Sequence, residues 1–399
     1  MNKNNYYTGI ELTSQSIKLI VGSEINGKIY VLDTLEKACS GLNNGLIISS
    51  DEVTKCLNEI VLEASKKLNI NPQIKDVSLI LPPFSLACAT DSGSTTTISS
   101  DDIVGHVDTM NIIAQIKKRN FKEEDLKIVD IVPDSYLIDN NERYDTEPIG
   151  KTSEALSLHA SIYAMSAKVF QQFCACIKKA NLNLRYSTIS PYAISLYLST
   201  FDGMPPSYIL IDIGHSLTTI SHIQQGKTII KSSMMRFGGK DISQFVADKF
   251  KISFNEAEEI KVKYGLEHDP NFKVYIKNDI TFDKLSDAIA TCLTPALDEI
   301  KKIIEEFSID DNNQLPIVLC GGTSQLNHID NLIADELDRK IINYQIPTLG
   351  ARDKGLLAVL GIIKYWSEQP RIDEEDKITA SVTRVDSKKN SKFNITEEL

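Results

Sequence analysis

The sequence lacks a surplus of positive charge, a long apolar run and a recognisable export signal. Its 54 acidic residues outnumber 43 lysines and arginines, which gives a formal net charge of −11. A general nucleic-acid binder draws its affinity from basic surfaces, so this balance argues against that class. No apolar stretch approaches the roughly 20 residues of a membrane-spanning helix. The first residues, MNKNNYY, contain no apolar core, so we expect no signal peptide.

Cysteine pairs and histidine clusters of the kind that hold metals are missing too. The seven cysteines include no C-x-x-C pair, and the six histidines show no metal-ligand spacing. Most cysteines stand among apolar residues, so we expect buried free thiols in a reducing cytoplasm. The remaining composition, 42% hydrophobic and 24% charged over 399 residues, is that of an ordinary globular protein with room for two domains.

The central motif occupies residues 208–221, YILIDIGHSLTTIS, and predicts a buried strand, a sharp turn and a second strand. Asp212 ends the first strand, and Gly214 stands in the turn. Because glycine permits a left-handed or close-approach backbone, N–H groups and hydroxyls of the turn can face an anion such as phosphate. The Asp212 carboxylate can hold a hydrated Mg²⁺ beside it. A plain hairpin without a ligand is the alternative.

The same pattern occurs near the N-terminus. The segment 8–20, TGIELTSQSIKLI, aligns Glu11 with Asp212, and a second turn follows each copy, NGK at 26–28 and QGK at 225–227. Two related strand–turn–strand–turn units suggest two related domains that face each other. We therefore expect an α/β fold in which two sheet-bearing halves clamp a phosphate chain between their hairpins.

Further motifs suit the rest of a nucleotide. The Gly-Gly pair at 321–322 follows an apolar strand and precedes a helix, so it can admit adenine or phosphate to the backbone or simply form a tight turn. The Gly-Gly pair at 238–239 allows the same two interpretations. Glu258 and Lys261 share a helix face and suit two ribose hydroxyls, with a surface ion pair as the alternative. His215 could meet phosphate or remain a solvated turn residue.

Apolar periodicity predicts the other elements. Strands are expected over 7–20, 28–35, 77–81, 158–164 and 315–320, and an apolar piece at 126–132 ends ahead of Pro133. Helices are expected over 52–68, 101–118, 167–180, 190–200, 254–265, 288–307, 324–337 and 349–366, and from 241 onward. Asp51 or Ser50 can cap the first helix, and an SFNE capping box at 253–256 begins another.

Two segments differ from the rest. Residues 84–158 open with a small polar run and carry a polar turn, which indicates a compact inserted subdomain. Residues 367–399 hold scattered apolar residues and mixed charges, which predict a disordered tail. No basic amphipathic helix of the kind that lies in a membrane interface is visible in that tail.

In this order the motifs resemble the actin–hexokinase–chaperone ATPase pattern, and within it the chain resembles FtsA, the actin-like bacterial cell division family. The resemblance covers nearly all of residues 7–366 in the family's order. The specific segments are GGKDIS at 238–243, AEEIKVKYG at 257–265, LCGGTSQLNHI at 319–329, IVDIVPDSYLIDN at 128–140, EPIG at 147–150 and STISPYAIS at 187–195.

The resemblance implies an actin-like ATPase fold with the FtsA-type insert and with ATP and Mg²⁺ between its halves. Glu11 and Asp212 would hold the Mg²⁺ through water, and no catalytic residue is assigned. The implied phosphate contacts are Thr13, Ser14, Ser16, Gly214, His215 and Ser216, and the implied nucleotide contacts are Gly238, Gly239, Glu258, Lys261, Gly321, Gly322, Thr323 and Gln325. The implied parts are subdomain 1A (1–83, 163–204 and 348–366), 1C (84–162), 2A (205–239 and 310–347), 2B (240–309) and the tail (367–399).

The resemblance also implies partners and a location. Copies of the chain would polymerise into an actin-like filament through the insert, and residues 240–309 would bind the C-terminal peptide of FtsZ, the tubulin-like ring protein. The protein would recruit later division proteins at the cytoplasmic face of the membrane. A tail helix would anchor it there only if one lies within or beyond the C-terminus. The alternatives are a pilus-assembly adaptor of the PilM type and a sugar or acetate kinase or a phosphatase of the superfamily. The VPDSYLIDN and EPIG segments favour FtsA over the PilM type, and kinases and phosphatases lack the insert.

The phosphate turns depart from the family pattern. The first turn in the family reads close to G-I-D-I-G-T-S-K, but here Glu11, Thr13 and Ser16 replace its aspartate, glycine and lysine. A β-branched threonine is unfavourable where glycine lets the backbone meet phosphate, and the lost lysine removes a balancing charge. The family's D-I-G-G-G-T-T becomes DIGHSLT at 212–218. We therefore expect nucleotide binding with an altered phosphate preference and ATP hydrolysis that is weak or absent.

Overall fold

The structure is a computed structural model that describes residues 6–26, 28–99, 101–118, 125–139, 142–267, 275–277, 279–307, 314–369 and 394–395. It divides into two compact units. The first contains Met1–Pro83 and Gln172–Trp366, and the second contains Phe84–Gln171 and Ser367–Leu399. The second unit begins where the sequence indicates an insert, and the division into four subdomains stays a prediction.

The first sheet of the first unit has five strands in the order β11-β6-β1-β2-β3. β1, β2 and β3 form an antiparallel meander, and β1 pairs in parallel with β6. The strands are β1 Tyr6–Leu12, β2 Ser16–Ile25, β3 Lys28–Ala38, β6 Asp76–Leu81 and β11 Asn183–Ile189, with a small hairpin of β4 Leu42–Asn43 and β5 Leu46–Ile47.

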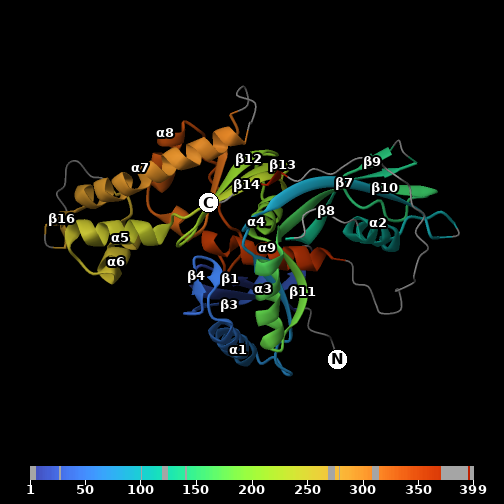
Figure 1. The fold of residues 1–399 in the computed structure, drawn as a ribbon, viewed down its shortest axis with the longest axis horizontal. Helices are drawn as coiled ribbons and strands as arrows, with labels where there is room; N and C mark the ends of the chain where they lie inside the picture. Colours follow the sequence, from blue (N-terminus) through green and yellow to red (C-terminus); the bar gives the residue numbers. More distant parts are fainter. Residues whose placement is uncertain are drawn as a thin grey trace. The chain divides into compact units, whose positions relative to one another are not determined.

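Four helices accompany this sheet (Figure 1): α1 Ser50–Lys67, α3 Ala167–Lys179, α4 Ser190–Leu198 and α9 Leu357–Glu368. The entirely apolar first turns of α9 are buried because the helix packs directly on β1. A Cβ added at Gly9 of β1 would lie 2.9 Å from Ile362, so the bare glycine permits this close approach. The same helix crosses α4 at Gly361, where an added Cβ would lie 2.0 Å from a backbone oxygen.

The second sheet of this unit repeats the arrangement of the first. Its order is β14-β13-β12-β17, again an antiparallel meander whose first strand pairs in parallel with a later one. The strands are β12 Tyr208–Ile213, β13 Thr218–Gln224, β14 Thr228–Met235 and β17 Ile317–Cys320. The repeated strand–turn–strand unit that the sequence predicts is therefore present in both sheets.

Helices α5, α6 and α7 extend from one end of the second sheet as a group (Figure 1). A shared apolar core joins α5, α7 and α8 to β12 and β17, because their apolar stripes face one another. The elements are α5 Gly239–Phe250, α6 Phe254–Tyr264, α7 Phe282–Glu306 and α8 Ile329–Leu337, with short strands β15 Tyr275–Lys277 and β16 Ile280–Thr281.

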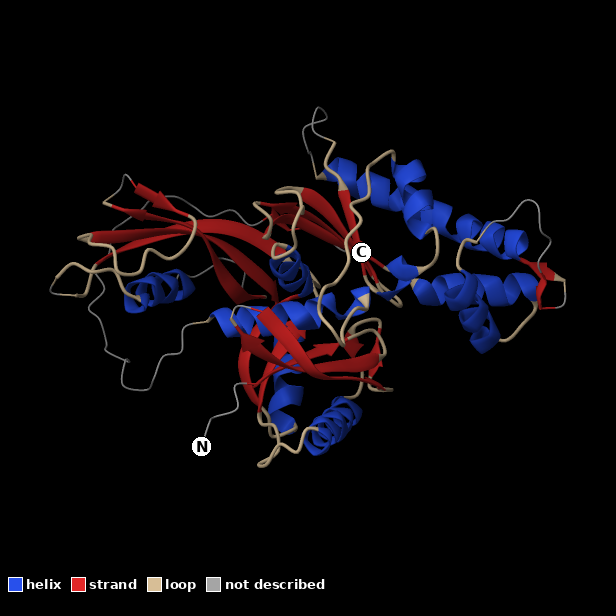
Figure 2. Cartoon of the chain, turned by 180° about the vertical axis from the view of Figure 1, so that it is seen from behind, coloured by secondary structure: helices blue, strands red, loops and turns tan. Residues whose placement is uncertain are grey.

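The second unit contains its own sheet and helix. The strand order is β18-β7-β10-β8-β9, and α2 lies along one face of the sheet (Figure 2). The elements are β7 Ala87–Thr96, α2 His106–Lys118, β8 Leu126–Ile138, β9 Glu142–Tyr144, β10 Ala155–Ser166 and β18 Asn394–Ile395. Most of the predicted disordered tail lies outside the described residues, and β18 pairs with β7.

Several predicted ends are corrected. The cap of α1 is Ser49, whose hydroxyl accepts from the Glu52 amide, and neither Asp51 nor Ser50 has that role. Helix α2 begins at residue 106 instead of 101, and α7 begins at residue 282 instead of 288. The helix starts six residues earlier than its apolar stripe suggests because the Thr281 hydroxyl accepts from the Lys284 amide and so caps α7. Apolar periodicity does not detect such a cap.

Two further helices, α8 and α9, begin later than the sequence predicts. The predicted helix over 324–337 is a 3₁₀ turn, Gly322–Gln325, followed by α8, and His328 between them has a φ of 62° that interrupts the helix. The predicted helix over 349–366 begins with a 3₁₀ turn, Lys354–Leu356, ahead of α9. In the second unit β8 continues past Pro133, where the pairing with β10 shifts in register as proline in a strand requires.

All seven cysteines are free and five of them are buried, as the sequence predicts. Within the described ranges, no helix is both long and apolar enough to cross a membrane.

Candidate functional site

A cavity of about 430 Å³ lies within the first unit, where the β1–β2 turn and the β12–β13 turn both reach its wall. That volume is within the roughly 300–1,000 Å³ of small-molecule sites. The duplicated turns are far apart in the sequence, and the two sheets bring them to one place. The structure thus supplies the shared cavity that the repeated motif predicts.

An acidic pair and a lysine form the floor of the cavity. Glu11 lies directly opposite Lys18 in the β1–β2 register, and both line the cavity with Asp212. Burial raises the pKa of Glu11 to about 7; Lys18 opposes this rise, and Asp212 and Glu36 add to it. Burial alone would lower the pKa of Lys18, but Glu11, Glu36 and Asp212 raise it above its ordinary value. Lys18 is therefore a partly buried ammonium group, and its Nζ donates to the Gly355 carbonyl at 2.7 Å.

Asp212 is held against the start of the Gly-Gly turn. Burial raises its pKa, while Lys18 and a hydrogen bond with the Cys320 thiol oppose the rise. A Cβ on Gly321 would lie 2.4 Å from Asp212 Oδ1 and 2.4 Å from the Ile213 carbonyl, and the φ of Gly321 is +83°. Position 321 therefore requires glycine on two independent grounds.

The first turn is closed by its own side chains. The Thr13 amide donates to the Ser16 carbonyl at 2.8 Å. The Thr13 hydroxyl accepts from the Ser16 amide at 3.1 Å and, more weakly, from the Gln15 amide at 3.5 Å. The Ser16 hydroxyl donates to Glu36 Oε1 at 2.6 Å. Thr13 and Ser16 thus bind each other and Glu36 as well as lining the cavity.

The second turn is supported from behind by the start of α5. The amides of Gly239 and Lys240 donate to the carbonyls of Gly214 and His215 at 3.0 and 2.8 Å. A Cβ on Gly238 would lie 2.6 Å from His215 backbone atoms, so this glycine lets the helix touch the turn. These two amides at the N-terminus of α5 therefore donate to the turn. In a helix that binds phosphate with its N-terminus, such amides would be free to donate to the phosphate.

His215 lines the cavity from the β12–β13 turn and is partly buried. Burial lowers its pKa below the ordinary value, so the imidazole is neutral at pH 7.

Glu258 and Lys261 do not form an ordinary surface pair. Lys261 is 3% exposed, and its Nζ donates to Glu258 Oε2 at 2.7 Å and to the Gly239 carbonyl at 2.8 Å. Burial would raise the pKa of Glu258, but hydrogen bonds from Lys261 and Ser243 lower it. The surface alternative is therefore wrong for Lys261, and the pair presents a fixed carboxylate at the cavity wall.

The Gly-Gly turn after β17, Gly321 and Gly322, also lines the cavity. Gly322 has open space where a Cβ would be, with no atom of the described residues within 4 Å. Thr323 Oγ1 donates to the Gly214 carbonyl at 2.8 Å and so ties this turn to the β12–β13 turn. Gln325 Nε2 donates to Asp353 Oδ1 at 2.8 Å, so Gln325 holds the segment that precedes α9.

The structure gathers most of the predicted residues around one cavity. Ser216 is buried beside the cavity and Gly238 stands behind the turn, and neither lines it. The lining residues that the sequence predicts are Glu11, Thr13, Ser14, Ser16, Asp212, Gly214, His215, Gly239, Glu258, Lys261, Gly321, Gly322, Thr323 and Gln325.

Sequence reasoning missed four charged lining residues: Lys18, Glu36, Asp353 and Lys354. Ser16 stands where the family pattern has its lysine, but Lys18 brings an ammonium group to the same cavity from β2. Strand periodicity could have found it, because the residue opposite an acid in a tight hairpin shares its face.

Comparisons with known proteins follow the same motifs. The family model described as Cell division protein FtsA matches residues 209–361. The Cell division protein FtsA of Enterococcus faecalis (strain ATCC 700802 / V583) is 24% identical over 381 residues, covering 92% of this chain and 85% of that protein. The Bacillus subtilis (strain 168) protein of the same name is 20% identical over 385 residues, covering 93% and 86%.

Solved structures share the fold. A PilM–PilN type IV pilus biogenesis complex matches with a TM-score of 0.61 at 17% identity, covering 91% of this chain and 99% of that one. MreB5 of Spiroplasma citri bound to AMPPNP matches with a TM-score of 0.51 at 11% identity, covering 90% and 95%. The predicted fold class and the predicted resemblance are both confirmed. The chain has the actin-like ATPase fold, and its sequence is similar to the FtsA cell division proteins along most of its length.

Proposed function

We propose that this protein is an actin-like cell division protein that binds an adenine nucleotide and assembles with copies of itself. The observation that carries the proposal is the convergence of two acid-ended turns, Glu11 and Asp212, on one cavity in a chain similar to FtsA over 92% of its length. The proposal extends to links between FtsZ filaments and the division site, and to recruitment of later division proteins there.

Adenosine would occupy the part of the cavity lined by α6 and the Gly-Gly turn. The Glu258 carboxylate, fixed by Lys261, suits two ribose hydroxyls because it only accepts hydrogen bonds. The open space at Gly322 lets a flat base approach the backbone. A thermal-shift titration with adenosine and its nucleotides, with and without Mg²⁺, tests this assignment. Complete indifference of the melting temperature to every one of them would contradict it.

The donor set fits a hydrated Mg²⁺. Glu11 Oε2 is buried without a hydrogen-bond partner among the described residues, and Asp212 lines the same space. No group of three His, Cys, Asp or Glu residues that could hold a metal directly occurs in the described ranges, so Glu11 and Asp212 would hold the ion through water. Bound there, Mg²⁺ would neutralise phosphate charge.

Hydrolysis is proposed to be weak or absent. His215, the lining imidazole of the second turn, has its pKa lowered by burial and is neutral, and no residue of this wall is assigned to position an attacking water. Phosphate release from ATP measured over hours should stay near the uncatalysed background, and brisk turnover would contradict this part.

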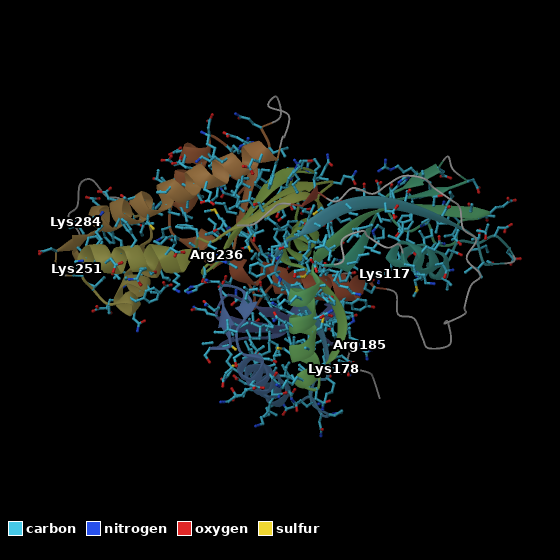
Figure 3. All side chains as sticks on the ribbon, in the orientation of Figure 1. Lys117, Lys178, Arg185, Arg236, Lys251 and Lys284 are labelled. Carbon is cyan, nitrogen blue, oxygen red and sulfur yellow. The ribbon has the colours of Figure 1, made fainter. Side chains whose placement is uncertain are left out.

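The partner segment is residues 240–309, which holds α5, α6 and α7. Lys251 and Lys284 lie at the end of this segment that carries β16 (Figure 3). We propose that this segment captures an FtsZ C-terminal peptide. Isothermal titration calorimetry with that peptide should give micromolar affinity, and its clean absence would favour the pilus-adaptor alternative, which shares the fold.

The decisive experiment for the whole proposal is co-sedimentation of the purified protein with and without nucleotide and FtsZ, followed by electron microscopy. Filaments of the protein, and its appearance in the FtsZ pellet, support the proposal. A protein that stays monomeric in the supernatant under every condition refutes it.

A further inference from the structure

The two turns that reach the cavity differ in what their amide groups already bind. In the first turn, residues 13–16, three of the four amides have an acceptor inside the turn: Thr13 N binds the Ser16 carbonyl, and Gln15 N and Ser16 N bind the Thr13 hydroxyl. In the second turn the Gly214 amide binds the Leu217 carbonyl, while His215 N and Ser216 N have no acceptor within the described ranges. One turn is closed and the other is open.

The Thr13 side chain is the cause of the closure. Its Oγ1 accepts at 3.1 Å from the amide of Ser16, the position at which an anion oxygen would accept. It also donates to the Ser16 carbonyl at 3.0 Å, so both of its hydrogen-bonding roles are used. A phosphate oxygen could replace this hydroxyl only if the threonine side chain left the turn. Thr13 directly follows β1, so the strand fixes the position of its Cα and Cβ.

Charge acts in the same direction as the closure. The Ser16 hydroxyl donates a hydrogen bond to Glu36 Oε1 at 2.6 Å, so an acidic group lies beside the turn. Glu11 and Asp212 lie on the same wall, and Lys18 is the lysine that interacts with all three acids. Without bound Mg²⁺, a terminal phosphate at this turn would add negative charge next to three carboxyl groups and one ammonium group.

We propose that Thr13 and Glu36 close the first turn to a terminal phosphate, so that the site prefers an adenine nucleotide with one or two phosphates over the triphosphate. This inference rests on the adenine-nucleotide function proposed above and names the ligand class of that site. Thr13 acts as a specificity-determining residue, because its hydroxyl occupies the amides that a third phosphate would need. The open second turn still serves the shorter phosphate chain.

The test is isothermal titration calorimetry of the full chain with adenosine, AMP, ADP and ATP, each with and without Mg²⁺. The wild type should bind ADP or AMP about tenfold or more tightly than ATP. Thr13→Gly frees the amides and should raise the affinity for ATP about tenfold, while adenosine affinity changes by less than about threefold. Thr13→Ser keeps the hydroxyl and should keep the wild-type order, which separates the hydrogen bonds from a general loosening of the turn.

Glu36→Gln gives an independent arm should Thr13→Gly fail to fold. It removes charge from β3 without altering the turn backbone, and it should raise ATP affinity more at low salt than at high salt. Wild-type protein that binds ATP as tightly as ADP, or Thr13→Gly protein with unchanged ATP affinity, overturns this inference and leaves nucleotide binding standing. If adenosine, AMP, ADP and ATP all fail to bind both proteins, the proposed function itself is overturned.

Discussion

Replacing Gly321 by alanine tests how the second sheet shapes the cavity. Gly321 follows β17 and has a φ of +83°, a backbone conformation that an alanine adopts only with strain. The new Cβ would lie 2.4 Å from both Asp212 Oδ1 and the Ile213 carbonyl, and 2.7 Å from the Ile213 carbonyl carbon. The backbone atoms cannot give way as the end of a flexible side chain can, so β12 or the turn has to move.

Two contributions set the size of the effect. A non-glycine residue in the left-handed region costs about 1–2 kcal/mol. Forcing a methyl group against packed atoms costs about 1–3 kcal/mol more. We therefore expect Gly321→Ala to lower the free energy of unfolding by about 2–5 kcal/mol, which lowers the melting temperature by roughly 5–15 °C for a unit of this size.

Gly322→Ala is the matched control on the neighbouring residue. No atom of the described residues lies within 4 Å of a Cβ added there, so the melting temperature should change by less than about 2 °C. The methyl group does enter the space assigned to adenine, and adenosine affinity should fall at least about tenfold. We therefore expect Gly321 to serve the fold and Gly322 to serve the ligand.

The measurements are thermal unfolding by circular dichroism and calorimetric titration with adenosine, on the wild type and both variants. Equal loss of stability in the two variants would refute the argument from the Gly321 geometry. Unchanged adenosine affinity in Gly322→Ala would refute the placement of the base beside this turn, whatever the stabilities show.

Three further predictions concern the same unit. Glu258→Gln leaves the buried Lys261 without its carboxylate, so it should cost about 1–3 kcal/mol of stability in urea unfolding and weaken adenosine binding in calorimetry. The control Glu259→Gln changes an exposed neighbour and should have neither effect. Glu11 has a pKa of about 7 in the folded protein, above the ordinary 4.5, so the wild type loses stability as the pH rises through this interval. Glu11→Gln lacks this titration, so its free energy of unfolding should gain about 2–3 kcal/mol relative to the wild type between pH 5 and pH 8. Urea unfolding at both pH values measures the difference. Gly361→Ala puts a Cβ 2.0 Å from a backbone oxygen of α4 and should yield little soluble protein, a result that normal expression and an unchanged melting temperature would contradict.

Local pattern was enough to predict the strands and turns around the site. A buried strand that ends in an acid, followed by glycine and hydroxyl residues, determines a strand–turn–strand unit within about fourteen residues, and periodicity of two or 3.6 predicts which face is apolar. The duplication of that unit at Glu11 and Asp212 then predicted two related sheets and a shared cavity. The resemblance to FtsA followed from motifs that lie in the same order as in that family.

Only the tertiary structure decided how those units are completed. Lys18 enters the cavity because the hairpin register places it opposite Glu11, and Asp353 and Lys354 enter because α9 packs back on β1 from the far end of the chain. The sequence also does not reveal that the Thr13 turn is closed. A threonine hydroxyl can bind phosphate, water or its own backbone, and only the structure shows which partner it has. The reason is physical: a hydrophobic period acts over neighbouring residues, whereas burial, charge and hydrogen-bond partners depend on which distant segments meet.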